Sequence, residues 1–520
     1  MLKNVLAQIA ASSSFLNLFI FLGLITTLVA FSVRWWKQKN TYKSLQSLPS
    51  PPKHWLLGNI PQILAAVKQK RFFQLLFDWS QKLGPMYVYW AGQPTVILSK
   101  PKVIEETVIN GMRDGSLVRS KRARKAWNDI GGSILLGQNG SEWQWRRKAW
   151  NPEFSSSSLS KYVEIISQAC EQVIEKIQQT ESPKEVQVDH LFVELTMRVI
   201  SCLVMGIPVD GKTVSHEGQP LDVAQVYEAT SVLSYRFLRV ATGEKMWKKY
   251  LPTKNSRDYW AARRYLDELI GPRVDLALQL REQNKTDLEK VSSLFQESML
   301  VKIAAKEPNY NRESLIAEAI ELLIAGTDTT AHTISFTIAE LSLNPRVFQK
   351  ARVVVDQVWE KQGCITTESF KDLAYIQAIF KETLRLYSIA SGSTSLEAER
   401  DIVIDGQEIP RGTKIFWSML AAGRDPEVYS QPEEFLPERW LDKNKETHQL
   451  PMITFGSGSH RCLGEHLSML EATVMLSLLL HYFDWELVNG RSSVEQLQQN
   501  LLIYPADGMP VRFKLRTQES

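Results

Sequence analysis

One cysteine in this sequence lies in a setting suited to binding a metal. Cys462 sits in the segment 455–464, FGSGSHRCLG, directly ahead of an amphipathic, helix-like stretch. A helix N-terminus favours an ionised sulfur, Gly458 and Gly464 let the backbone approach a large flat group, and Phe455 suits a hydrophobic wall. A thiolate opposite oxygen donates electron density to haem iron and promotes O–O cleavage. Cys462 is therefore a candidate haem-iron ligand, and the alternative is a buried, inert cysteine.

A polar motif lies inside the long helical pattern that runs from Leu315 to Leu343. Threonine is a poor interior helix residue because its hydroxyl competes for backbone carbonyls, and Gly326 leaves room beside the helix. The motif Ala325–Thr330, AGTDTT, predicts a distorted turn that holds O₂ and water. Asp328 and Thr329 would then relay protons to a reduced oxygen species. The alternative is a polar patch on a buried helix.

A second helical pattern, Ile376 to Leu386, carries an acid and a base three residues apart. Glu382 and Arg385 lie on one helix face and can pair. Arg439, in the sequence PERW, can complete a buried Glu–Arg–Arg cluster, and such a set must be well satisfied to survive burial. An ordinary surface salt bridge is the alternative.

A third helical stretch ends before Pro152 and carries Trp143 and Arg147 four residues apart. Both side chains can point at an anionic carboxylate of haem, as can His460 or Arg461 beside the cysteine. The neighbouring Arg146 and Lys148 leave a basic surface helix as the alternative.

Bulk composition narrows the classes of protein. The chain has 520 residues, of which 44% are hydrophobic and 23% charged, with a formal net charge of +4. That charge argues against bulk nucleic-acid binding, so no nucleic-acid partner is expected. The four cysteines, Cys170, Cys202, Cys364 and Cys462, form no CxxC pair. A disulfide framework or zinc ribbon is therefore not expected, and a reducing compartment fits.

The N-terminal region predicts a membrane anchor. After the N-terminal segment 1–14, residues 15–33 form a run without a charged side chain, long enough at ~1.5 Å per residue to cross a hydrocarbon core of roughly 30 Å. Arg34, Lys37 and Lys39 follow, so the positive-inside rule predicts a single-pass protein with its catalytic domain in the cytoplasm. Residues 34–53 read as a basic, proline-rich linker and hinge. A cleaved signal peptide is the alternative.

The remainder, residues 54–520, reads as one unit that is mainly α with a minor β region. Helical patterns dominate from Ser141 to about His481. Short β-like runs are expected at 86–90, 95–98, 401–416 and 501–515, each with turn residues beside it.

The motifs follow one another in an order that resembles the cytochrome P450 family, from Leu48 to about Arg516. The resemblance implies a triangular helical prism, preceded here by one transmembrane helix. It also implies haem b with Cys462 as the axial ligand. Trp143, Arg147 and His460 would contact the propionates, Glu382, Arg385 and Arg439 would form a structural triad, and Asp328 and Thr329 would be the acid–alcohol pair.

The implied reaction is insertion of one O₂ atom into a hydrophobic organic substrate. Electrons would come from NADPH, through an NADPH–cytochrome P450 reductase or a ferredoxin-type donor. A basic face including Arg146 and Lys148 would steer an acidic redox partner. If the source is eukaryotic, the endoplasmic reticulum membrane is the expected location.

Three positions depart from the family pattern. His460 stands where most members have arginine, Ser388 replaces a common proline, and Leu396 falls near a usual propionate-binding arginine. Arg461 is a candidate replacement for the missing cation.

Substrate contacts are expected from apolar residues near the motifs, which suit a lipid, sterol or terpenoid: Ile134, Leu322, Ala325, Ile389 and Ile503. Two other functions stay open. One is a reductase-independent haem-thiolate isomerase or dehydratase, and the other is a non-catalytic membrane haem-binding protein. The intact Asp328-Thr329 pair favours the monooxygenase.

Overall fold

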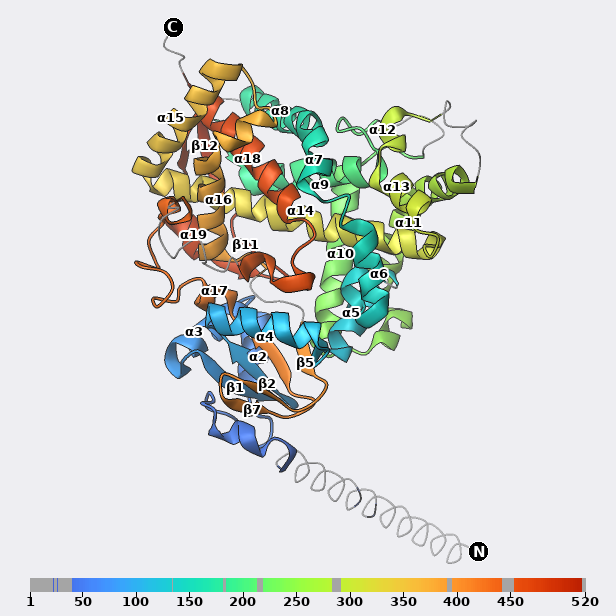
Figure 1. Cartoon of the computed structure of the whole chain (residues 1–520), viewed down its shortest axis with the longest axis vertical. Coiled ribbons are helices and arrows are strands. Elements are labelled where there is room, and N and C mark those ends of the chain that lie inside the picture. Colours follow the sequence, from blue (N-terminus) through green and yellow to red (C-terminus); the bar gives the residue numbers. More distant parts are fainter. Residues whose placement is uncertain are drawn as a thin grey trace, which may run out of the picture.

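The computed structural model describes residues 22, 26, 40–132, 134–180, 184–212, 218–282, 291–390, 395–441 and 453–516. Helices and small sheets alternate along these residues (Figure 1). The α-helices are α2 Ile60–Lys68, α3 Phe72–Leu83, α4 Pro101–Arg113, α5 Lys121–Gly131, α6 Gly140–Trp150, α7 Ser156–Leu159, α8 Val163–Gln179, α9 Val188–Met205, α10 Val223–Ala241, α11 Lys254–Glu282, α12 Ser293–Gln296, α13 Met299–Lys306, α14 Arg312–Leu343, α15 Pro345–Gln362, α16 Ala374–Tyr387, α17 Met419–Ala422, α18 Glu465–Tyr482 and α19 Ser492–Glu495. The 3₁₀ turns are η1 Lys43–Ser47, η2 Leu135–Gly137, η3 Ser160–Tyr162, η4 Met246–Tyr250, η6 Glu368–Lys371, η7 Pro437–Trp440, η9 Ile453–Phe455 and η10 Gly458–His460. The strands are β1 Met86–Ala91, β2 Gln93–Leu98, β3 Leu117–Arg119, β4 Lys184–Gln187, β5 Leu396–Ala398, β6 Ile402–Ile404, β7 Gln407–Ile409, β8 Lys414–Trp417, β9 Phe483–Leu487, β10 Leu497–Gln499, β11 Ile503–Pro505 and β12 Pro510–Leu515.

Helix α14 is the central element of the helical part (Figure 1). It starts with a capping box between Asn311 and Ser314, which satisfies backbone donors that a helix start leaves free. Most of its residues are buried, as expected for a helix that is apolar on nearly all sides. It packs on α9, α11, α16 and α18.

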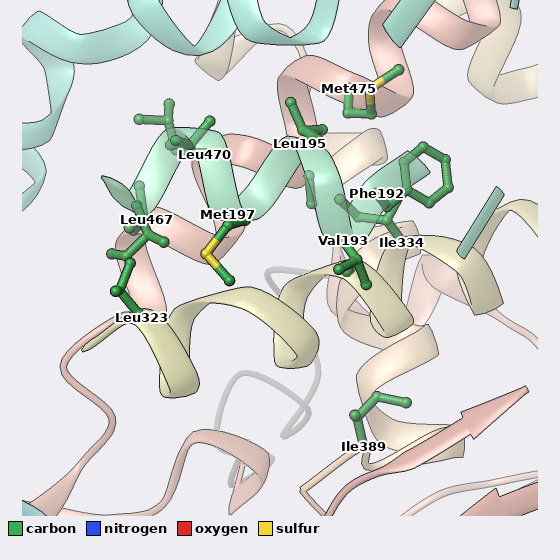
Figure 2. Packing of buried hydrophobic residues seen from close by; sticks show 14 of the residues in the cluster. Phe192, Val193, Leu195, Met197, Leu323, Ile334, Ile389, Leu467, Leu470 and Met475 are labelled. Carbon is green, nitrogen blue, oxygen red and sulfur yellow. The ribbon is translucent and has the colours of Figure 1, made fainter. Parts of the chain in front are cut away.

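The core beside α14 is built largely by α9 and α18. Figure 2 shows Val193 and Met197 of α9 turned toward α14, with Leu467 and Leu470 of α18 beside them. Met197 is 0% exposed, so these helices are packed without space for water between them. This packing fixes α14 relative to the segment that carries Cys462.

Four small sheets account for the β structure among the described residues. The largest has five strands in the order β1-β2-β8-β5-β3, and lies at one end of the molecule with α2, α3 and α4 (Figure 1). Its strand pairs are antiparallel except β2 with β8. A second sheet has the order β4-β12-β9, and the other two are the pairs β6-β7 and β10-β11. The prediction of a mainly α fold with a minor β region is confirmed.

The predicted membrane anchor, 15–33, lies outside the described residues apart from Leu22 and Thr26, as does the segment 1–14. Among the residues that are described, no helix is both long and apolar enough to span a bilayer. Within the predicted linker, Tyr42 and Leu45 are buried against the five-stranded sheet, and Val88 donates its backbone N–H to Pro49 at 2.9 Å. The packed body therefore extends into the segment predicted as a hinge.

Candidate active site

Cys462 closes a tight loop between η10 and the start of α18 at Glu465. Its backbone N–H donates to the carbonyl of Phe455 at 2.6 Å, which folds the loop back on itself. Gly456 and Gly458 have φ of +75° and +64°, a conformation that side chains disfavour. The glycine-rich segment is therefore needed to form this loop.

Cys462 is an exposed residue whose thiol is nevertheless largely surrounded by protein. This desolvation raises the pKa of the thiol, while the backbone N–H of Gly464 lowers it. On α14, Ala325 is likewise exposed although Leu322, Leu323 and Ile324 before it are buried.

Two cations border the same region without a carboxylate partner. Arg119 ends β3 and Arg147 lies on α6, and within the described part of the chain neither forms an ion pair. Burial lowers the pKa of Arg147, and the nearby Cys462 sulfur offsets part of this by raising it. Burial also lowers the pKa of Arg119 to about 10, with the Glu321 carboxylate raising it and Arg147 lowering it further. A buried and a half-buried cation without an ion pair in the described chain are suited to binding an anion.

Arg119 was not predicted from the sequence, because its place in the site depends on the pairing of two distant strands. In the sheet, Arg119 pairs directly with Leu396, the position at which the expected arginine is missing. Residues paired across antiparallel strands lie on the same face of the sheet. Arg119 thus provides a cation on the neighbouring strand. Arg461, the other candidate, is taken up by Glu465, whose Oε1 lies 2.6 Å from its Nη2.

Trp143 and His460 are brought together as a stacked pair. Their ring centroids are 3.6 Å apart at an interplanar angle of 16°. Burial lowers the pKa of His460 to about 3, with Arg119 and Arg147 adding to the effect, so the ring is neutral at physiological pH. Nδ1 of His460 and Nε of Arg147 are buried without a hydrogen-bond partner in the described structure.

The prediction that Arg146 belongs to an exposed basic face is wrong. Arg146 is 4% exposed, and its Nη1 lies 2.7 Å from Oε1 of Glu318 on α14. One side of α6 faces inward, and it carries Trp143, Arg146 and Trp150 at helical spacings of three and four residues. Lys148, in contrast, is exposed.

The motif Ala325–Thr330 lies within unbroken helix, so the predicted interruption of α14 is not observed. Thr329 Oγ1 donates to the carbonyl of Ala325 at 2.7 Å, and Thr327 does the same to Leu323. These bonds follow the pattern by which helical threonines satisfy their hydroxyls. The space expected beside Gly326 is occupied, because a Cβ there would lie 3.1 Å from Ile200 of α9.

Asp328 lies one residue before Thr329, and the polar groups that act on it are His332, Asp189 and Tyr227. Burial raises the pKa of Asp328, while His332 one turn later lowers it. Its Oδ1 is buried and has no hydrogen-bond partner among the described residues. A carboxyl in this state favours its protonated form and can act as an acid.

The structure brings Glu382, Arg385 and Arg439 into one network. Arg385 donates to both oxygens of Glu382, at 2.9 and 2.7 Å, and Arg439 Nε lies 3.0 Å from Oε1. Trp440 Nε1 and the backbone of Leu436 donate to the same carboxylate, each at 2.9 Å. The carboxylate of Glu382 is fully buried and fully bonded.

The predicted substrate contacts divide into two kinds. Ala325 is exposed, whereas Ile134, Leu322, Ile389 and Ile503 belong to the main hydrophobic core. Ile503 donates its N–H to the carbonyl of Ile389 at 3.0 Å, which joins those two segments. The segment after them, 391–394, lies outside the described residues.

These residues fit an iron porphyrin. The sulfur of Cys462 is a soft ligand that suits iron, and both Cys462 and Ala325 are exposed. Arg119 and Arg147, which form no ion pair within the described residues, suit the two carboxylates of the porphyrin. Thr330 Oγ1 donates to Ser468 Oγ at 3.1 Å, which ties α14 to the first turn of α18 beyond Cys462.

Comparison with known proteins agrees with this geometry. The Cytochrome P450 family model matches residues 48–512. The chain is 28% identical to "Cytochrome P450 71A1" of Persea americana, over 89% of each chain. It is 24% identical to "Cytochrome P450 734A1" of Arabidopsis thaliana over 98% of each, and 25% identical to "2-hydroxyisoflavanone synthase" of Glycyrrhiza echinata over 87% of each. The chain therefore belongs to the cytochrome P450 family, and is a haem-dependent oxidoreductase of the monooxygenase type.

Proposed function

We propose that this protein inserts one atom of O₂ into a hydrophobic organic substrate, such as a lipid, sterol or terpenoid. Its electrons come from NADPH through a separate reductase or ferredoxin-type donor. The observation that carries the proposal is the desolvated thiol of Cys462, combined with an acid and an alcohol at positions 328 and 329 of α14. The exposed, apolar Ala325 beside them supports a hydrophobic substrate.

Cys462 holds haem b in this proposal. Haem supplies the activation of O₂ when bound, and its sulfur ligand donates the electron density that promotes O–O cleavage. The loop from Phe455 to Cys462 fixes the sulfur, since the N–H of Cys462 is itself bonded to Phe455. Arg119 and Arg147 orient the cofactor through its two carboxylates, and the stacked Trp143 and His460 complete that side of the site, with the other cofactor-loop residues Gly458 and Gly464 leaving room for the macrocycle.

Asp328 and Thr329 handle the protons. Burial raises the pKa of Asp328, so its carboxyl takes up a proton more readily than an exposed aspartate does. The Thr329 hydroxyl uses its hydrogen on the Ala325 carbonyl, which leaves its oxygen free to accept a hydrogen bond from water. Asp328 then gives its proton to that water, and Thr329 keeps the water in place.

The partners of this reaction follow from the surface and the N-terminal region. The exposed Lys148 on α6 contributes to attraction of an acidic electron donor, without Arg146. Residues 15–33 anchor the chain in a membrane as a single pass, with the catalytic domain on the cytoplasmic side. In a eukaryote this is the endoplasmic reticulum membrane.

Product formation with a reductase tests the proposal. The full chain, in detergent or nanodiscs with haem, is supplied with a reductase, NADPH and a panel of lipids, sterols and terpenoids. A substrate is first recognised by its shift of the haem spectrum. We expect that substrate to increase NADPH consumption and to gain one oxygen atom, which carries the label when ¹⁸O₂ is used. Conversion without NADPH would instead identify an isomerase or dehydratase.

Thr329→Ala tests the proton step within the same assay. Removing the hydroxyl should release hydrogen peroxide in place of product and raise the peroxide-to-product ratio about tenfold or more. Thr337→Ala is the matched control, since Thr337 makes the same backbone bond on α14 but also bonds Thr383, away from Ala325. Product formation in Thr329→Ala as tightly coupled as in the control would mean that another group holds the water.

A further inference from the structure

A buried histidine lies one helical turn after Asp328 on α14. His332 is 5% exposed, and residues four apart on a helix have Cβ atoms about 5–6 Å apart on one face. Its Nδ1 lies 2.8 Å from Oδ1 of Asp189. The family motif does not account for His332, because it lies beyond Ala325–Thr330.

Asp189 is itself held in place. It lies in the first turn of α9, where the helix N-terminus stabilises negative charge. Its Oδ1 also accepts a hydrogen bond from Ser335 Oγ at 2.8 Å, and its backbone N–H donates to Gly508. A carboxylate with these partners orients the imidazole, much as a carboxylate fixes the tautomer of histidine in other sites.

Groups from four elements surround His332. Asp189 comes from α9 and Asp328 from α14, and the hydroxyl of Tyr227 on α10 hydrogen-bonds Asp328 and lowers the pKa of that carboxyl. Tyr504 on β11 lies with its ring centroid 6.0 Å from that of His332, and its hydroxyl is bonded to Lys70 at 2.9 Å. Two acidic groups thus face the imidazole, and Lys70 is taken up by Tyr504 and Gln498.

The charges of His332 and Asp328 depend on each other. Burial lowers the pKa of His332, but the carboxylates of Asp189 and Asp328 outweigh burial and raise it. Burial in turn raises the pKa of Asp328, and His332 lowers it. Without a cation nearby, a buried carboxyl with an unpartnered oxygen would hold its proton too tightly to be a useful acid.

We propose that His332, held by Asp189, is a positioning residue that stabilises the carboxylate left on Asp328 after it gives up a proton. This inference rests on the proposed role of Asp328 as the acid. It assigns to Asp189 and His332 an effect on how tightly oxygen reduction is coupled to product formation. It predicts that they have no effect on substrate binding, because both side chains are buried.

Coupling as a function of pH tests the proposal. His332→Asn removes the charge and keeps a donor for Asp189, and Asp189→Asn removes the carboxylate. Both should raise the peroxide-to-product ratio about fivefold or more below pH 7, with an unchanged KM for the substrate. In the unaltered protein the ratio should rise with pH as His332 loses its proton, and this dependence should be absent in His332→Asn. The matched control is His190→Asn, an exposed neighbour of Asp189 on the same helix, which should behave as the unaltered protein.

A second measurement does not use activity. Because the pKa of His332 is raised in the folded protein, protonation stabilises the fold at pH values below the unfolded imidazole pKa of about 6.5. This contribution is lost as pH rises through the folded value. The difference in unfolding temperature between the full-length protein and His332→Asn should therefore be largest below pH 6.5 and shrink at higher pH. Carbon-13-labelled histidine NMR should show a ring that stays protonated above pH 6.5.

The outcomes separate the inference from the function. If the unaltered protein makes product and His332→Asn couples as tightly at every pH, the inference is overturned and the proposed function stands. If no substrate gains oxygen, the proposed function fails. In that case the difference in unfolding temperature between the unaltered protein and His332→Asn decides the inference. A difference that does not change with pH overturns it.

Discussion

Two buried clusters of charge in this molecule are built on opposite principles. Around Glu382, two arginines, one tryptophan and one backbone N–H converge on a single carboxylate. Around Arg119 and Arg147, burial disfavours both cations, and Arg147 further lowers the pKa of Arg119 although Glu321 raises it. Within the described residues, no carboxylate lies within ion-pair distance of either.

The contrast separates structural charges from ligand-binding ones. A buried ion is stable only when its partners satisfy it, so the complete set at Glu382 is part of the folded scaffold. We propose that the set at Arg119 and Arg147 is completed when an anion binds, and that the carboxylates of haem are this anion, because Cys462 lies nearby.

The largest effect is expected from Glu382→Ala. It leaves Arg385 and Arg439 buried without their shared carboxylate, and breaking such a set costs about 3–5 kcal/mol. We expect loss of folded, haem-containing protein, measured by the yield of soluble protein and by chemical denaturation. Glu486→Gln, which removes one exposed ion pair with Arg512, is the control and should leave the unfolding midpoint unchanged. Normal stability of Glu382→Ala would mean that the cluster is not structural.

Replacing Arg119 or Arg147 should have opposite effects on the haem-free and the haem-bound protein. Arg119→Met and Arg147→Met remove charges that burial disfavours, so the haem-free protein should become more stable by about 1 kcal/mol or more. The same variants should lose haem faster, measured by transfer of haem to an excess of apomyoglobin. Arg122→Met, at an exposed position of α5, is the control for both measurements.

The informative result is whether the haem-free protein becomes more or less stable. A haem-free protein destabilised by either substitution would show that Arg119 and Arg147 are structural like Arg385. Unchanged haem retention in the double variant would show that the anion they bind is not a carboxylate of the cofactor.

A smaller effect is expected from replacing His460, a neutral residue that lies near Arg119 and Arg147. Its folded pKa is depressed to about 3, below the unfolded imidazole value of about 6.5. The unfolded state therefore binds the proton more readily between these values, and stability is lost as pH falls from about 6.5 toward 3. His460→Phe keeps the stack on Trp143 and should lose less stability over this range, measured by thermal unfolding. Equal acid sensitivity of both proteins would mean that His460 titrates normally.

The sequence predicted the parts of the site that depend on local pattern. Cys462 ahead of a helix, Glu382 and Arg385 on one helix face, and the long helix carrying Asp328 were all visible from spacing and residue type. The approximate strands were visible as well, because turn residues mark them. These features require only the periodicity of helices and strands.

Features that depend on pairing between distant segments were not predictable in this way. Arg119 lies opposite Leu396 only because β3 and β5 pair in the sheet. Arg146 looks like part of a basic surface, and Glu318, 172 positions later, is what makes it a buried ion pair. Ser388, in place of a proline, has φ of +43° at the end of α16, a conformation that proline cannot adopt.

The bond between Cys462 and iron is the central claim, and the spectrum of the reduced protein with carbon monoxide tests it most directly. The full-length protein, expressed with ample haem supply, should show the red-shifted Soret band of a thiolate-ligated haem, and Cys462→Ala should lose that band. Colourless protein, a Soret band typical of nitrogen ligation, or a red-shifted band that persists in Cys462→Ala would contradict the account.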